Sequence, residues 1–217
     1  MNALNLKSAK LSSFLAGIAL VFVCALPAQA GATTYYIQAD QTTPLGADGT
    51  ANLPNGSNSD FFARTTFTTV APAGSSTTIR DSVWSFGGFK TIGCIYRPAV
   101  YGGSVSLGGT PTGTVWVRST NATDQFRFAL VDYEPVSGSK TILGYSNTIS
   151  APGGPSTASR TLSFTLSTST IPVDHTLALE IQFKPATNGA RGRVFCNTTT
   201  YPSAITVDET ITGVNHT

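Results

Sequence analysis

An eight-residue segment near the C-terminal end constrains the fold more than any other part of the chain. From Leu177 to Lys184, large apolar side chains occupy every odd position, and the even positions hold Ala, Glu, Gln and Lys. A period of two is typical of a half-buried β-strand. Pro172 lies just before the segment, where a strand can start without losing a ladder hydrogen bond. A sheet face with four large apolar side chains requires a second layer to cover it.

Most of the remaining chain repeats this pattern in short segments separated by turn residues. Alternation is clearest around Phe126 to Leu130 and Leu162 to Leu166, and no segment after the N-terminus shows a helical period. About ten short strands with turns between them predict an all-β fold, an antiparallel β-sandwich that is jelly-roll-like. Neither an internal repeat nor a domain boundary interrupts the pattern. We therefore expect a single β-sandwich domain over residues 31–217.

The N-terminus has the features of an export signal. Lys7 and Lys10 supply positive charge, an apolar run follows from Phe14 to Leu26, and Ala28-Gln29-Ala30 is a small-residue cleavage site. The apolar run is shorter than the ~20 residues that span a bilayer. The sequence thus predicts a signal peptide over residues 1–30. A lipid anchor at Cys24 is the alternative, but bulky residues precede that cysteine.

Charge limits the partners that this chain is expected to bind. The chain has 13 Lys+Arg and 11 Asp+Glu, and the signal region accounts for two lysines, so the remainder is balanced at 11 of each. A balanced chain with 11% charged residues offers no basic stripe for nucleic acid and no polybasic membrane patch. We expect no nucleic-acid partner, no membrane association after signal cleavage, and a secreted or periplasmic location that includes the cell surface.

Two cysteines follow the signal region, Cys94 and Cys196. An exported chain reaches an oxidising compartment, where two cysteines favour one disulfide. Both lie in short apolar runs that read as strands, either adjacent or on opposite sides of the sandwich. The bond would close a loop of about 100 residues, which chain entropy rates at about 4–5 kcal/mol as an upper figure. Two unpaired thiols are the alternative.

The order of segments in the C-terminal half resembles a known family. Three strand-like runs come first: Phe126 to Pro135, Leu143-Gly144-Tyr145 and Leu162 to Leu166. A proline-containing turn, a histidine and a Leu-x-Leu-x-Ile strand follow over Ile171 to Ile181. This order resembles the jelly-roll, galactose-binding-like modules of secreted bacterial proteins, including those appended to hydrolases. Those modules usually have Gly where this chain has Asp174. The resemblance covers the second half of the chain and implies a fold, which does not by itself imply a function.

Catalytic chemistry has one candidate pair, Asp174-His175, the one acid–imidazole neighbour pair in the body of the chain. A hydrolase would also need a sharply presented serine, and the chain has no G-x-S-x-G. We expect His175 to pack or hydrogen-bond at the start of a strand, and we expect no enzymatic activity. Zinc is not expected, because one histidine and two bridged cysteines leave no ligand set.

A long polar segment offers a candidate site for calcium. Asp40, Asp48 and Asp60 occur among Asn, Gly and Ser residues over Asp40 to Asp60. Calcium takes oxygen ligands from carboxylates, amides and carbonyls, but the spacing matches no EF-hand loop. Ordinary turn chemistry is the alternative. We expect no cofactor beyond this possible calcium ion.

Aromatic side chains are the candidate ligand-binding residues. If Val115 and Val117 face the core, then Trp116 between them faces solvent or a partner. Four tyrosines extend this candidate surface: Tyr35, Tyr36, Tyr96 and Tyr101. Aromatic rings on a sheet face can stack on sugars and can anchor interfaces. Burial in a second core layer or under a loop is the alternative.

These observations predict an exported, non-enzymatic β-sandwich with a binding or structural role at the surface, in a matrix or in the periplasm. Its partners would be copies of itself or a cell-surface glycan. Self-assembly is plausible because an unpaired sandwich edge can accept a strand, and Thr33 to Gln38 would be the donor. A carbohydrate-binding module that uses Trp116 is the alternative, and a hydrolase that uses Asp174-His175 is the second alternative.

Overall fold

The computed structural model describes residues 29–39, 65–73, 77–80, 87–97, 99–196 and 198–213. Within these residues the regular structure consists of thirteen β-strands without a helix, which confirms the predicted all-β class. The strands are β1 (Gln29–Ala39), β2 (Thr65–Thr68), β3 (Thr77–Arg80), β4 (Lys90–Tyr96), β5 (Ser104–Ser119), β6 (Gln125–Glu134), β7 (Ser139–Ser146), β8 (Ile149–Ser150), β9 (Ala158–Leu166), β10 (Thr170–Ile171), β11 (Thr176–Lys184), β12 (Gly192–Cys196) and β13 (Ala204–Thr212). Strands β8 and β10 have two residues each and are too short to give a sequence pattern. No helix suited to crossing a membrane occurs in the described ranges.

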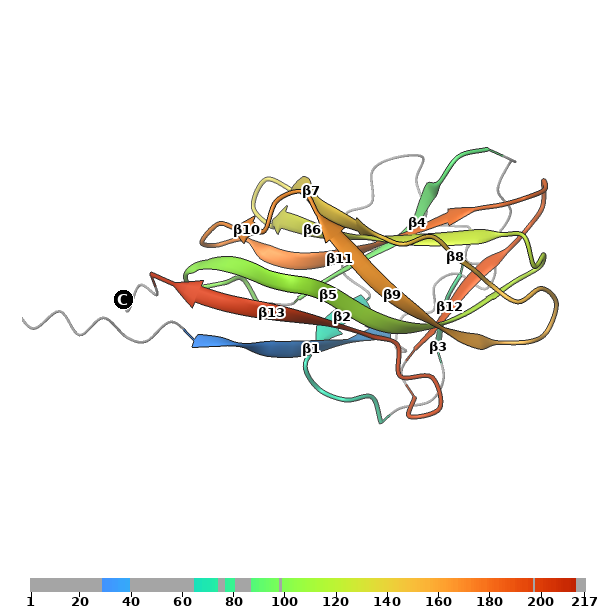
Figure 1. Cartoon of the computed structure of the whole chain (residues 1–217), viewed down its shortest axis with the longest axis horizontal. Helices are drawn as coiled ribbons and strands as arrows, with labels where there is room; N and C mark the ends of the chain where they lie inside the picture. Colours follow the sequence, from blue (N-terminus) through green and yellow to red (C-terminus); the bar gives the residue numbers. More distant parts are fainter. Residues whose placement is uncertain are drawn as a thin grey trace, which may run out of the picture.

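The strands form one curled sheet that closes on itself. Its order is β13-β1-β2-β4-β11-β6-β7-β9-β5, and β5 pairs again with β13, while β12 and β3 extend from β5. The pairs are antiparallel except for β2 with β4. Figure 1 shows the ring flattened into a sandwich, with β6, β7 and β11 in one layer, β1, β5 and β13 in the other, and β9 crossing between them. This closure pairs most strand edges within the chain.

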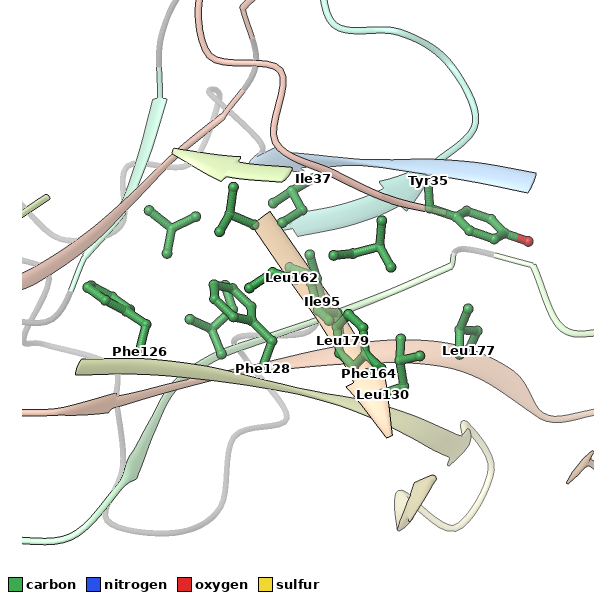
Figure 2. Packing of buried hydrophobic residues seen from close by; sticks show 14 of the residues in the cluster. Tyr35, Ile37, Ile95, Phe126, Phe128, Leu130, Leu162, Phe164, Leu177 and Leu179 are labelled. Carbon is green, nitrogen blue, oxygen red and sulfur yellow. The ribbon is translucent and has the colours of Figure 1, made fainter. Parts of the chain in front are cut away.

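The core lies between the two layers and is built around β11. This strand is hydrogen-bonded to β4 on one side and to β6 on the other, so that Leu179 lies opposite both Ile95 and Leu130. The four odd-numbered apolar residues of β11 are fully buried. Figure 2 shows Leu177 and Leu179 in the same cluster as Leu162 of β9 and other apolar side chains. Burying each such side chain stabilises the fold by about 1.5–3 kcal/mol.

The prediction that β11 is half-buried is wrong, because its outer face is covered as well. Ala178 is fully buried, and Glu180 and Gln182 are only 9% and 8% exposed. Thr91 Oγ and Gln182 Nε2 both donate to Glu180 Oε1, each at 2.6 Å. Hydrogen bonds therefore compensate for the loss of water around these polar groups.

A long side chain from β6 completes this cover. Arg127 donates from Nε and Nη2 to Gln182 Oε1 at 2.9 and 2.7 Å. Its guanidinium lies 4.4 Å from the ring centroid of Phe89 and 4.1 Å from that of Tyr145. Cations over aromatic faces are attracted by the ring quadrupole. Arg127 thus shields the polar face of β11 from solvent.

The predicted strand donor, Thr33 to Gln38, lies within β1. On one edge β1 pairs with β13, and on the other it pairs with β2. Thr33 to Tyr36 pair with β13, and Tyr36 to Gln38 pair with β2. Most of the predicted signal peptide, residues 1–28, is outside the described residues. Cleavage after Ala30 would leave Gly31–Ala39 of this strand.

Candidate functional site

Four neighbouring strands form a groove on the outer face of the layer that contains β5. The register places Tyr36 of β1 beside Ala204 of β13, Ala204 beside Thr114 of β5, and Thr114 beside Thr161 of β9. Directly opposed residues project from the same side of a sheet, so these residues form a row across the face. The groove has a volume of about 550 Å³ and is open to solvent. Its lining consists of Thr34, Tyr36, Thr112, Gly113, Thr114, Trp116, Ser159, Thr161, Pro202, Ala204 and Thr206.

The lining combines aromatic rings with many hydroxyl groups. Tyr36 and Trp116 are partly exposed, and the Oγ atoms of Thr34 and Thr206 lie 2.9 Å apart. Gly113 contributes only backbone to the lining, because it lies opposite the buried Ile205 and a Cβ there would meet Ile205 Cδ1 at 2.5 Å on the core side. Such a surface can offer ring faces to apolar C–H groups, and hydroxyl donors and acceptors to polar groups.

The turn after β12 holds Trp116 in place. The backbone N–H of Trp116 donates to Ser203 Oγ at 2.9 Å, and the Ser203 hydroxyl donates to the Phe195 carbonyl at 2.6 Å. The Trp116 ring packs edge-on against Tyr201, with centroids 5.4 Å apart. Tyr201 in turn lies 5.3 Å from the Phe195 ring. The indole is therefore supported from one side and leaves the rest of its surface to the groove.

Two of the tyrosines predicted to be exposed are buried, so that prediction is wrong for them. Tyr35 and Tyr101 are each 2% exposed. Tyr35 is the chain neighbour of Tyr36, and successive residues of a strand point to opposite faces. Both buried hydroxyls donate to Glu209 of β13, at 2.8 Å from Tyr35 and 2.6 Å from Tyr101. The side chain of Tyr96, the remaining predicted tyrosine, is outside the described residues.

This buried cluster changes the acid–base behaviour of both tyrosines. Burial raises the pKa of Tyr35 and of Tyr101 above the ordinary value of 10.0. The negative charge of Glu209 acts in the same direction, because it opposes a second negative charge nearby. The cluster is therefore a structural feature of the sandwich interior rather than part of the groove.

His175 has a different partner from the one suggested by the sequence. Its Nδ1 lies 2.8 Å from Oδ1 of Asp132 on β6, whereas Asp174 is exposed and adopts a positive φ of 64°. Among the described residues, no Ser, Thr or Cys side chain hydrogen-bonds to His175. A histidine–carboxylate pair can orient an imidazole for proton transfer, but acyl transfer also requires an adjacent nucleophile.

The predicted calcium residues, Asp40, Asp48 and Asp60, are outside the described residues. Within the described ranges, no group of three or more His, Cys, Asp or Glu side chains is placed to hold a metal ion. Cys196 is buried in the core cluster, and the side chain of Cys94 is outside the description. The disulfide stays a prediction.

Comparison with known proteins shows similarity of fold. No family model matches this sequence, and no curated protein matches it either. A CocE/NonD family hydrolase from Staphylococcus aureus is similar in two crystal structures: TM-score 0.53 at 8% identity over 86% of this chain, and TM-score 0.50 at 9% identity over 85%. An α-amino acid ester hydrolase has TM-score 0.42 at 11% identity, over 53% of this chain and 25% of its own.

The match covers most of this chain but a much smaller share of the S. aureus hydrolase. This chain spans 37% of the S. aureus hydrolase. At such low identity the similarity concerns the β-sandwich fold, and a shared fold hosts unrelated functions. The matched part is a minority of the S. aureus hydrolase, and its activity is that of the whole protein.

Proposed function

We propose that this chain is an exported, non-enzymatic β-sandwich protein that binds carbohydrate in the groove over β1, β13, β5 and β9. The observation that carries the proposal is the placement of Tyr36 and Trp116 in one groove whose other lining residues are mostly Thr and Ser. Of the roles expected from the sequence, glycan binding is the one that uses this surface. The signal-like N-terminus supports an encounter outside the cytoplasm.

The chemistry of the groove suits a sugar better than an apolar ligand. A pyranose presents C–H groups on its ring faces and hydroxyls at its edge. Trp116 can cover the first, and Thr114 and Thr161 can hydrogen-bond with the second. Because the groove is open rather than enclosed, it suits a segment of a polymer more than a small molecule that would need to be surrounded.

Polysaccharide pull-down and affinity electrophoresis test the proposal. We expect Trp116→Ala to lose most retention and Trp116→Phe to recover part of it, because Phe restores a ring face. Thr114→Val should weaken retention, since it removes a groove hydroxyl at nearly constant volume. Thr141→Val on β7 is the matched control, an exposed threonine on the other layer. Equal retention of wild type and Trp116→Ala on every polysaccharide would refute the proposal.

A hydrolase is the second candidate function, and one observation favours it: the pair of His175 and Asp132 at 2.8 Å. An esterase and glycosidase screen with His175→Ala as comparison separates the two functions. Turnover that wild type shows and His175→Ala lacks would replace the non-enzymatic proposal. Turnover that is equal in both proteins would show that His175 is not its catalytic residue.

A further inference from the structure

A second hollow lies beside the aromatic groove and is strongly basic. It has a volume of about 310 Å³ and lies where β5, β12 and three loops meet. Its lining consists of Arg118, Ser119, Thr120, Gly154, Pro155, Arg191 and Arg193. Three of these residues carry a guanidinium group and none is acidic. Since only 11% of the chain is charged, this concentration of one sign is a local feature.

The backbone that carries these arginines is fixed by hydrogen bonds. The Arg191 N–H donates to Thr120 Oγ at 2.9 Å, and the Arg191 carbonyl accepts from the Thr120 N–H at 3.1 Å. Arg118 donates from Nη1 to the Pro155 carbonyl at 3.0 Å and lies 5.3 Å from the Phe195 ring centroid. The hollow is therefore preorganised, which lowers the entropic cost of binding.

A buried carboxylate near the hollow accepts hydrogen bonds from the adjoining loops. Asp124 is fully buried and accepts a hydrogen bond from Ser119 Oγ. It also accepts from the backbone N–H groups of Asn121 at 3.1 Å and Ala186 at 2.7 Å. Asp124 joins the loop after β5 to the loop after β11 and does not line the hollow.

The register places like charges side by side. Arg193 of β12 lies directly opposite Arg118 of β5. An oxyanion bound near both guanidinium groups would accept charge-assisted hydrogen bonds from them. Among the described residues, no carboxylate forms an ion pair with Arg118 or Arg191. Arginine suits carboxylate and sulfate groups because its planar donors can bind two oxygens at once.

We propose that this hollow is an anion subsite of the groove, so that the bound glycan carries carboxylate or sulfate groups. The inference rests on the proposed function. Trp116 and Arg118 are two residues apart on the same face of β5, about 7 Å along the strand. Phe195 and Arg193 are their respective partners on β12. One polymer that stacks on Trp116 can therefore place an acidic group in the hollow.

The test compares three immobilised polymers: a polyuronate, a sulfated polysaccharide and a neutral polysaccharide. Wild type, Arg118→Gln, Arg191→Gln and Trp116→Ala are measured at low and moderate salt. Arg160→Gln is the matched control, because Arg160 lies on neighbouring β9 but does not line the hollow. We expect wild type to bind an acidic polymer at least tenfold more tightly than the neutral one. Arg191→Gln should remove most of this preference, and Arg160→Gln should preserve it.

The outcomes separate this inference from the proposed function. Stronger binding of the polyuronate assigns the subsite to carboxylate, and stronger binding of the sulfated polymer assigns it to sulfate. If Trp116→Ala abolishes binding but Arg118→Gln and Arg191→Gln change nothing, the groove stands and the anion subsite is refuted. If the arginine variants lose binding to an acidic polymer while Trp116→Ala keeps it, the hollow stands and the stacking groove is refuted. Absence of binding to all three polymers refutes both.

Discussion

Alkaline pH should destabilise this protein through two buried tyrosines. Burial raises the pKa of Tyr35 and Tyr101 in the folded state, so they keep their protons at a pH where the unfolded chain loses them. Their contribution to stability is therefore complete below the unfolded pKa of about 10 and declines above it. Each such tyrosine lowers the free energy of unfolding by about 1.4 kcal/mol per pH unit once its unfolded form is ionised. For both together, the loss between pH 9 and pH 11 is about 3 kcal/mol.

Urea unfolding at pH 9 and pH 11 measures this loss, and absorbance at 295 nm follows tyrosine ionisation. Tyr35→Phe should lose about half as much stability as wild type between the two pH values, because one of the two linked protons is gone. Tyr36→Phe is the matched control on the opposite face of β1, and it should behave as wild type. At neutral pH, Tyr35→Phe should cost about 1.5 kcal/mol, since Glu209 loses a charge-assisted hydrogen bond. An equal pH dependence in wild type and in the Tyr35→Phe, Tyr101→Phe double variant would refute this reasoning.

Three further predictions concern the backbone and the cysteines. Gly144→Ala should lower the free energy of unfolding in urea by about 3 kcal/mol, because its Cβ would lie 2.2 Å from a carbonyl oxygen of β9. Gly102→Ala is the control and should stay near wild type, because nothing lies within 4 Å of its Cβ. Equal losses in the two variants would contradict the clash. Asp174→Val should cost about 1–2 kcal/mol because φ is 64°, whereas Asp174→Gly should cost nothing, a difference that unfolding midpoints measure. Reduction should lower the melting temperature if Cys94 and Cys196 are bridged, and two titratable thiols in the unfolded, unreduced protein would exclude the bridge.

The core side of β11 could be predicted from its sequence, but its outer side could not. Alternation reports which residues of one strand share a face, so Leu179 and its companions were predictable core residues. The cover over Glu180 and Gln182 comes from Thr91 on β4 and Arg127 on β6. Those side chains reach β11 only through the strand order β4-β11-β6. A period-two pattern contains no information on which strands become neighbours.

The partner of His175 was missed for the same reason. A neighbour in sequence, Asp174, was the visible candidate, but the backbone turns through a left-handed conformation there and Asp174 is exposed. The carboxylate that contacts His175 belongs to Asp132, which lies opposite Leu177 in the pairing of β6 with β11. A glycine adopts a φ of 64° more readily than an aspartate does, so the residue type at this position gave little warning of the turn.

The tyrosine pair at the start of the domain shows how far sequence reasoning about a binding face can go. Tyr35 and Tyr36 are adjacent in an extended strand, so at most one of them could lie on the outer face. The choice between them depends on which face of β1 meets the core, and the pairing of β1 with β13 determines this. The same pairing brings Tyr36 into the groove that contains Trp116 and brings Tyr35 to Glu209. A shift of the β1 register by one residue would exchange the two tyrosines. Tyr35 would then lie on the outer face, and Tyr36 would point toward the core. The candidate binding face is thus a property of the register between strands that are distant in sequence, and the stability of the Glu209 cluster helps to fix it.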